Sequence, residues 1–239
     1  MTELYFSGER FTPTSGFSDG DPVDPGGGGG GGGGGTKVLE LSFDPDVRSF
    51  VEYNLSVAEP EFWVQFRVMF PADSYTEIFT WQPDIIAFAS STGIRSSIFA
   101  DDSTDKLWDW WSSYPAWGDI PADTWVTIDA HMAIVDSTSP PVKTLQFGFR
   151  VNSGALVAPE ETSEESFNDT FSGSTTWDFI RMGNAGFPSV PLHWYMDDLK
   201  VSYDNWVCDG GAIAFSDDYE SGSVSGGSVG GAAAVVPTP

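Results

Sequence analysis

Apolar and polar residues alternate along most of the chain from residue 38 onward. In the segment 62–70 every even-numbered position is apolar, and the segments 51–57, 126–134 and 145–151 alternate in the same way. Successive side chains of a β-strand point to opposite faces of the sheet. The pattern therefore predicts antiparallel strands that pack one face on a core and turn the other face toward water.

The last alternating segment, residues 192–203, changes phase once. Its apolar residues stand at even positions up to Met196 and at odd positions from Leu199 onward. An extra residue in a strand shifts every later side chain to the other face, as a β-bulge does. We therefore expect a bulge at Asp197-Asp198.

Short turn segments separate the predicted strands, and Asn152-Ser153-Gly154 is typical of a tight hairpin. No stretch sustains the 3.6-residue apolar period of a helix, and we expect the acidic segment Pro159–Glu165 to be a solvated loop or a single helical turn. About 10–14 strands follow from this count, which favours two stacked sheets. The predicted fold class is all-β, a two-sheet antiparallel β-sandwich of the jelly-roll kind.

Ten consecutive glycines, Gly26–Gly35, divide the chain. Glycine has no side chain to bury and loses the most backbone freedom on ordering, so this run is interpreted as a flexible linker. The expected organisation is an N-terminal docking arm (1–25), the polyglycine linker (26–35), the β-sandwich (36–207) and a Gly/Ala/Ser-rich tail (208–239). From Ser221 onward we expect the tail to lack order unless a partner holds it. Whether the arm is a tether or a strand of the sandwich stays open.

Charge excludes some partners. The formal net charge is −25, from 35 acidic and 10 basic residues. Affinity for phosphate depends on Lys and Arg, so neither nucleic acid nor an anionic membrane is expected as a partner. No apolar run is long enough to span a bilayer, and the N-terminus does not resemble a secretory signal. With Cys208 as the single cysteine, we expect synthesis in a reducing cytoplasm and no dependence on disulfides.

Three passages resemble the concanavalin A-like (laminin-G-like) lectin/glucanase domain. Thr124–His131 is similar to its central strand after a Pro/Asp turn, Lys143–Leu156 to the following hairpin, and His193–Ser202 to the closing strand with an Asp-Asp pair. Together the passages cover roughly residues 37–204. The resemblance implies a jelly-roll sandwich and carbohydrate binding.

The layout as a whole also resembles that of an actinobacteriophage virion protein, most of all a minor tail protein. This resemblance implies a structural protein of the virion, in the tail rather than the capsid, that contacts other virion proteins and a host cell-surface glycan. Homo-oligomers are typical of such components. Two alternatives stay open: a capsid decoration or head-fibre protein, and a glycan-degrading enzyme (depolymerase) with a non-standard site.

An unusual concentration of aromatic residues lies in the segment 107–117. Flat aromatic faces stack on sugar rings, and tryptophan also anchors protein interfaces. The same rings could instead pack in the core, and the sequence leaves these three readings open. The candidate residues for binding a glycan or a partner are Trp108, Trp110, Trp111, Tyr114 and Trp117.

Three carboxylates precede that segment, at Asp101, Asp102 and Asp105. Calcium prefers six to eight oxygen ligands, so these residues are a candidate Ca²⁺ site, although the run does not match an EF-hand loop. In so acidic a chain, a solvated turn explains the same cluster. No cofactor other than this possible Ca²⁺ is expected.

Catalytic motifs are not evident in the sequence. Glucanases with this fold carry paired carboxylates on one strand, and no strand here shows that pattern. The two histidines, His131 and His193, are predicted to face away from the apolar set, and the sequence shows no partner for either. We therefore expect a protein that is not an enzyme and has no catalytic residues. A depolymerase, if present, would depend on His131 or Asp129.

Overall fold

The computed structural model describes residues 37–89, 95–101, 106–109, 121–136, 142–151, 160–166, 176–207 and 210–239. These residues form a 13-stranded antiparallel sheet and one short helix. The elements are β1 (Lys37–Phe43), β2 (Ser49–Glu59), β3 (Glu61–Met69), α1 (Tyr75–Trp81), β4 (Asp84–Ala89), β5 (Arg95–Asp101), β6 (Lys106–Asp109), β7 (Val126–Asp136), β8 (Val142–Val151), β9 (Glu160–Ser166), β10 (Trp177–Asn184), β11 (Leu192–Ser202), β12 (Ile213–Asp217) and β13 (Gly227–Pro237).

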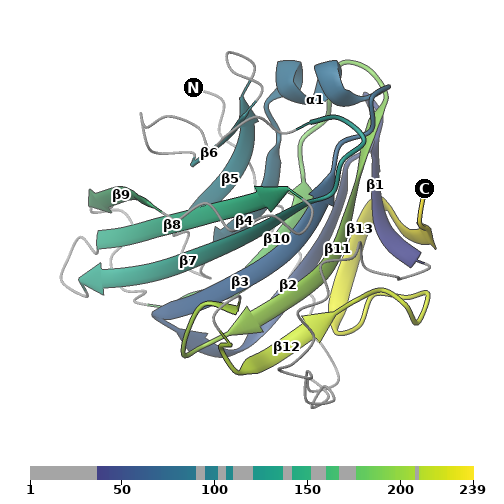
Figure 1. Cartoon of the computed structure of the whole chain (residues 1–239). Coiled ribbons are helices and arrows are strands. Elements are labelled where there is room, and N and C mark those ends of the chain that lie inside the picture. Colours follow the sequence, from purple (N-terminus) through teal and green to yellow (C-terminus); the bar gives the residue numbers. More distant parts are fainter. Residues whose placement is uncertain are drawn as a thin grey trace.

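The sheet curls into two facing layers. Its strands follow the order β6-β5-β4-β10-β2-β13-β1-β11-β3-β7-β8-β9, and β12 pairs with β11. In Figure 1 the layer of β3, β7 and β8 lies in front of the layer of β4 and β10. The predicted fold class, an antiparallel β-sandwich, is confirmed.

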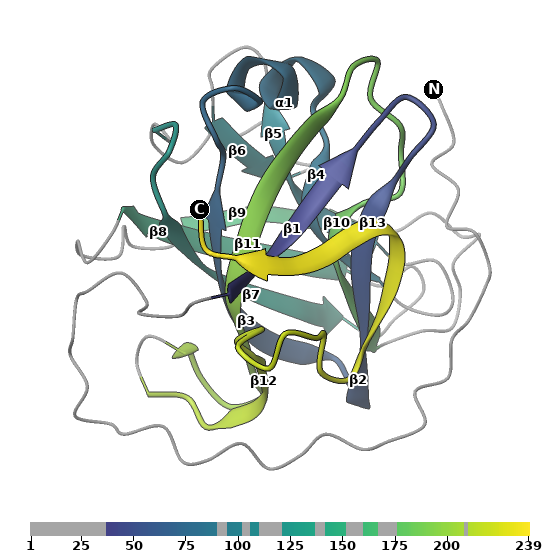
Figure 2. The ribbon, with the colours of Figure 1, turned by 90° about the vertical axis from the view of Figure 1, so that its right-hand side faces the viewer.

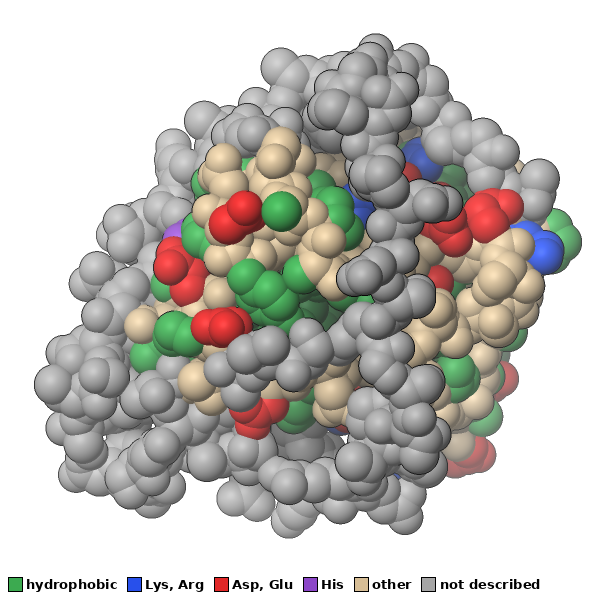
Figure 3. All heavy atoms as spheres, turned by 90° about the horizontal axis from the view of Figure 1, so that it is seen from below, with side chains coloured by type: hydrophobic (Ala, Val, Ile, Leu, Met, Phe, Trp, Pro, Cys, Tyr) green, Lys and Arg blue, Asp and Glu red, His purple; other side chains and the backbone are tan. Residues whose placement is uncertain are grey.

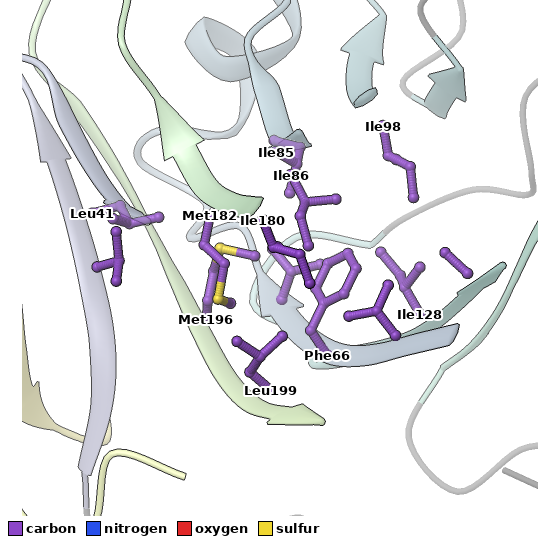
Figure 4. Packing of buried hydrophobic residues seen from close by; sticks show 14 of the residues in the cluster. Leu41, Phe66, Ile85, Ile86, Ile98, Ile128, Ile180, Met182, Met196 and Leu199 are labelled. Carbon is purple, nitrogen blue, oxygen red and sulfur yellow. The ribbon is translucent and has the colours of Figure 1, made fainter. Parts of the chain in front are cut away.

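The core lies between the two layers. Phe62 of β3 packs against Phe88 of β4 with ring centroids 5.6 Å apart. Met182 of β10 and Met196 of β11 likewise lie side by side in Figure 4. The inward positions predicted by the alternation in β7 are confirmed as buried: Val126, Ile128, Ala130, Met132 and Ile134.

The predicted bulge in β11 is confirmed. Its pairing with β3 shifts register between Asp197 and Lys200, and Asp198 has a left-handed backbone with φ of 53°. As a result Met196 and Leu199 both reach the core, although three positions separate them in sequence.

The C-terminal segment differs from the expected tail. The first half of β13 (227–231) pairs with β2 and its second half (232–237) pairs with β1, so it joins the two layers (Figure 2). The sandwich thus extends beyond residue 207, and the expectation that order is lost from Ser221 is wrong. The Gly/Ala-rich sequence showed no alternation because β13 has no fully buried residue: backbone pairing holds it, and only Ala233 and Val235 add partly buried contacts to the core.

A buried polar cluster fixes the turn before β13. The hydroxyl of Tyr53 donates to the carboxylate of Asp217 (3.0 Å) and lies 2.9 Å from the hydroxyl of Tyr219. The same carboxylate accepts the backbone N–H groups of Tyr219 and Ser225 at 3.1 and 2.7 Å. Burial raises the pKa of Asp217 above its ordinary value. These bonds tie the C-terminal segment to β2 inside the molecule.

Two further segments differ from the sequence expectations. Residues of the acidic stretch that begins at Pro159 form β9, which pairs with β8. β9 is the last strand of the sheet and is held by backbone hydrogen bonds to β8 along one edge. Such a strand can form without alternating apolar and polar residues. The hairpin residues Asn152–Gly154 lie outside the described residues.

The helix α1 is too short to show a helical period. It begins after Ser74 and ends at Gln82, which adopts a left-handed backbone with φ of 58° before Pro83. Ile78 and Phe79 bury one side of the helix. Among the described residues no helix has the length and hydropathy that a membrane crossing needs.

Candidate functional site

The face of β3, β7 and β11 that points away from the core carries a grid of polar and aromatic side chains. Each residue of β3 in this grid lies in register with one residue of β7 and one of β11. The residues that alternate with them, such as Val64, Phe66 and Ile128, are fully buried in the core. We call the following nine residues the polar face: Trp63, Gln65, Arg67, Thr127, Asp129, His131, Asp197, Lys200 and Ser202.

His131 stands at the aromatic end of the polar face. Its ring stacks on that of Trp63, with centroids 4.6 Å apart and planes 6° apart, and Trp206 meets it edge-on at 5.9 Å. Its Nε2 lies 2.7 Å from Oε1 of Glu61, whose side chain is 48% exposed. The prediction that His131 faces away from the core holds, and the structure supplies the partners that the sequence could not show.

Asp129 lies at the centre of the polar face and is fully buried. The side-chain amide of Gln65 donates to both of its carboxylate oxygens, at 3.0 and 3.2 Å. An amide that donates to both oxygens of one carboxyl group holds the two side chains in one orientation. Gln65 and Asp129 therefore form a rigid polar pair in the middle of the grid.

Asp197 occupies the other end of the polar face. It is 5% exposed, and its Oδ2 lies 3.5 Å from Nη1 of Arg67. The guanidinium of Arg67 also lies over the ring of Trp125, 4.9 Å from the centroid. Burial and the neighbouring charge of Asp198 raise the pKa of Asp197 to about 7, against the lowering effect of Arg67. This carboxyl therefore changes charge near neutral pH.

The polar face combines the groups that recognise hydroxyl-rich molecules. It offers carboxylate acceptors, amide and guanidinium donors, and aromatic rings within three neighbouring strands. All nine residues are on strands of the scaffold, which hold side chains more precisely than loops do. Asp197, whose pKa is raised to about 7, is also a group that can hold or release a proton near neutral pH.

A second cluster joins α1 to β11 and has a structural explanation. The hydroxyl of Ser74, the residue before α1, lies 3.1 Å from Nδ1 of His193 and accepts the backbone N–H of His193 at the same distance. Asp73 is exposed and its Oδ1 is 4.0 Å from Nε2 of His193. The Ser74 hydroxyl also donates to Oδ1 of Asp73 at 3.2 Å. These hydrogen bonds tie the start of the helix to the strand, which is the structural explanation of the cluster.

Most residues singled out in the sequence analysis lie where the structure gives no side-chain description. Trp108 is in β6, in register with Phe99, and Asp101 ends β5 in register with Lys106. The other candidates lie outside the described residues: Trp110, Trp111, Tyr114, Trp117, Asp102 and Asp105. Within the described part of the chain, no group of three or more His, Cys, Asp or Glu side chains is placed to hold a metal. The glycan-binding and Ca²⁺ assignments of that segment stay predictions.

Sequence reasoning missed the polar face as a unit. The alternation did mark Trp63, Gln65 and Arg67 as outward positions of one segment, and Asp129 and His131 as outward positions of another. The missing information was the strand order, because β3, β7 and β11 are adjacent in the sheet but far apart in sequence.

Comparison with known proteins gives distant structural similarity alone. No protein-family model and no curated protein matches the chain. Peanut lectin with a bound peptide is similar over 72% of this chain and 94% of the lectin, at 10% identity and a TM-score of 0.35. Alginate lyase vAL-1 from Chlorella virus is similar over 69% of this chain and 84% of the lyase, at 10% identity and a TM-score of 0.38.

A third similar structure is the catalytic domain of a glycoside hydrolase family 131 protein from Coprinopsis cinerea. The similarity covers 62% of this chain and 58% of that domain, at 14% identity and a TM-score of 0.33. These scores assign the chain to none of the three families. The expectation that the chain is not an enzyme is corrected: a glycoside hydrolase catalytic domain and an alginate lyase are among the similar structures, and at 14% and 10% identity they leave enzymatic activity open.

Proposed function

We propose that this chain binds a saccharide on its polar face. The observation that carries the proposal is the nine-residue grid itself, in which donors, acceptors and aromatic rings lie on three adjacent strands. Sugar hydroxyls both donate and accept hydrogen bonds, and a carboxylate next to an amide or a guanidinium serves both roles. The Gln65–Asp129 pair is buried beneath this face and holds β3 and β7 in place, so the groups that a saccharide can contact are the partly exposed ones beside it, Trp206, His131 and Glu61.

The aromatic end of the face supports the same proposal. Trp63 and His131 are stacked on one another, and Trp206 is partly exposed beside them. A partly exposed tryptophan at the border of a polar grid is suited to cover the apolar face of a sugar ring. Glu61, which holds His131, lies at this end as well.

Glycan-array binding followed by titration tests the proposal. We expect the chain from residue 37 to retain saccharide binding, and Trp206→Ala and His131→Ala each to weaken it at least about tenfold, which corresponds to roughly 1.4 kcal/mol. Phe187→Ala is the matched control, because Phe187 is 54% exposed and belongs to the β10–β11 connection. Equal affinities for all variants would contradict the proposal. Mass analysis of the saccharide after incubation reports any turnover.

A role in a phage virion, with the tail favoured over the capsid, stays a prediction. A saccharide-binding face would suit contact with a host-surface glycan, and several tethered copies would raise avidity without tight single-site binding. Immunogold labelling of assembled particles distinguishes tail from capsid.

A further inference from the structure

β13 connects the two layers of the sandwich. In the strand order it stands between β2 and β1, which follow one another in the sequence. Its first half pairs with residues 49–53 of β2 and its second half with residues 37–42 of β1 (Figure 2). We call these two segments the acceptor edges. Without β13 both edges would present unpaired backbone groups, which readily pair with another strand.

Side-chain burial contributes little to holding β13. No residue from 220 to 239 is buried, and Val229 is 51% exposed. The segment just before differs, because Phe215, Asp217 and Tyr219 are all buried. Elements with few buried contacts open at a lower free energy than the core does. β13 can therefore leave its place while the chain up to Tyr219 stays anchored.

The acceptor edges select the sequence of β13 by shape. A Cβ added at Gly227 would lie 2.8 Å from the side chain of Val51 and 2.9 Å from that of Tyr53, and one added at Gly230 would collide with the ring of Phe50. Strand addition takes its affinity from main-chain hydrogen bonds and its specificity from the sites of the side chains. A strand with the glycines of β13 meets this requirement, and every copy of the chain carries one.

A glycine-containing connection precedes β13. Residues 220–226 link the buried Tyr219 to the strand, and Gly222 and Gly226 within them have positive φ values of 81° and 70°. Fully extended, the connection spans about 23 Å. It is long enough to carry β13 from its own body to that of a neighbouring molecule.

A closed molecule and an exchanged pair differ in this connection alone. Both make the same pairing of β13 with the acceptor edges, so the strand contributes equally to both. The closed molecule keeps the hydrogen bonds of the connection, from Nζ of Lys37 to the carbonyl oxygen of Glu220 (3.1 Å) and from the backbone N–H of Ser225 to Asp217 (2.7 Å). Exchange of an identical element needs no new interface, and mass action favours it as the protein concentration rises.

On these grounds we infer that the acceptor edges bind β13 of a second copy, so that two copies exchange this strand and form a dimer. The pairing in the dimer has the register of the closed molecule. The inference does not depend on saccharide binding.

Charge sets a condition on the exchange. The net charge of −25 opposes the approach of two copies, and acidic side chains outnumber basic ones in the view of Figure 3. Salt screens this repulsion, with a Debye length that falls from about 10 Å at 0.1 M to about 3 Å at 1 M. The dimer fraction is therefore expected to rise with ionic strength, whereas salt weakens a dimer that surface ion pairs hold.

Disulfide trapping tests the inference in the full chain. Glu40 is in register with Ala234, and neither residue is buried. Directly opposite residues of antiparallel strands have Cα atoms about 4.5–5.5 Å apart, which suits a disulfide. Glu40→Cys and Ala234→Cys are placed in separate chains, both with Cys208→Ser to remove the native cysteine. The two chains, one of them carrying a mass tag, are unfolded together in urea, refolded as a mixture and then oxidised.

We expect a disulfide between the two chains, in an amount that rises with protein concentration and with ionic strength. Ser228→Cys in place of Ala234→Cys is the matched control, because Ser228 is in register with Glu52 and not with Glu40. A chain that carries both Glu40→Cys and Ala234→Cys verifies the register.

A variant of the connection tests the mechanism separately. Gly222→Ala places a Cβ on a residue whose positive φ disfavours it in the closed molecule, whereas the exchanged connection is free to adopt another conformation. The trapped dimer is expected to increase at least about threefold. Gly210→Ala also adds a Cβ at a positive φ, 87°, but outside the connection, and is expected to leave the dimer fraction unchanged.

Three results would overturn the inference. No disulfide between the separate chains, although the double variant forms its own, would show that β13 stays in its own copy. Equal trapping of the Ser228→Cys pair would show that the chains link by random collision. A double variant that forms no disulfide would contradict the register itself. None of these results bears on saccharide binding.

Discussion

Asp197 holds its proton near neutral pH because burial disfavours its charged form. In the unfolded chain this carboxyl ionises around its ordinary value of 3.8, whereas in the folded chain its pKa is about 7. Between these two values the folded state binds a proton that the unfolded state has released. The contribution of Asp197 to stability is therefore greatest below about pH 4 and is lost as the pH rises to 7.

This reasoning predicts how a neutral substitute behaves. The melting temperature of wild type is expected to fall more steeply between pH 4.5 and 7.5 than that of Asp197→Asn. Asp217, whose pKa is also raised by burial, remains in both proteins and acts equally on both curves. Calorimetric scans across this range check the expectation, and parallel curves would contradict it.

At the scale of single residues, the sequence indicated which face of a strand each side chain points to, but not what surrounds that side chain. The alternation placed the core positions of β7 correctly, and the phase change located the bulge at Asp197-Asp198. The alternation could not show that Asp197 is buried although it points away from the core. That burial depends on which segments of the chain cover β11.

At the scale of elements, β13 is the least expected part of the fold. It passes close to the turn that precedes β2: Gly231 has φ of 70°, and a Cβ there would collide with the carbonyl oxygen of Arg48. A Cβ added at Gly230 would likewise collide with the ring of Phe50. The glycines of this low-complexity segment are therefore needed for steric reasons, because residues with a Cβ could not approach β2 so closely.

Substitution of Gly231 tests this close approach. Gly231→Ala is expected to lower the free energy of unfolding by about 2 kcal/mol or more, from backbone strain together with displacement of Arg48. Gly210→Ala is the control, because Gly210 also has a positive φ, 87°, but no atom lies within 4 Å of its added Cβ. We expect the control to lose about 1 kcal/mol. Equal losses in denaturant titrations would show that β13 does not need this contact.

The elements that the sequence did not reveal share a physical cause. Alternation detects strands with one buried face, and it therefore found β2, β3, β7, β8 and β11. β9 and β13 depend on backbone pairing, and α1 is too short for a helical period. Predicting any of these three elements would have required knowing which strands lie next to it in the fold.

At the scale of the whole molecule, the fold class followed from the sequence and the polar face did not. Two-residue alternation over several segments is sufficient to predict a sandwich. The polar face needs the order of β7, β3 and β11 in the sheet, which the linear sequence does not contain. Clusters that are local in the sequence therefore indicated residues 101–117 rather than side chains that lie 60 or more positions apart on β3, β7 and β11.

The most direct test of saccharide binding on the polar face is nuclear magnetic resonance of the labelled chain during titration with an uncharged oligosaccharide. We predict shift changes at the indole N–H of Trp206 and the imidazole of His131, the partly exposed rings at this end of the face. The indoles of Trp177 and Trp194, which lie in the core, are expected to stay unchanged. Binding that leaves Trp206 and His131 unmoved and shifts signals of β4 or β10 instead would contradict the account.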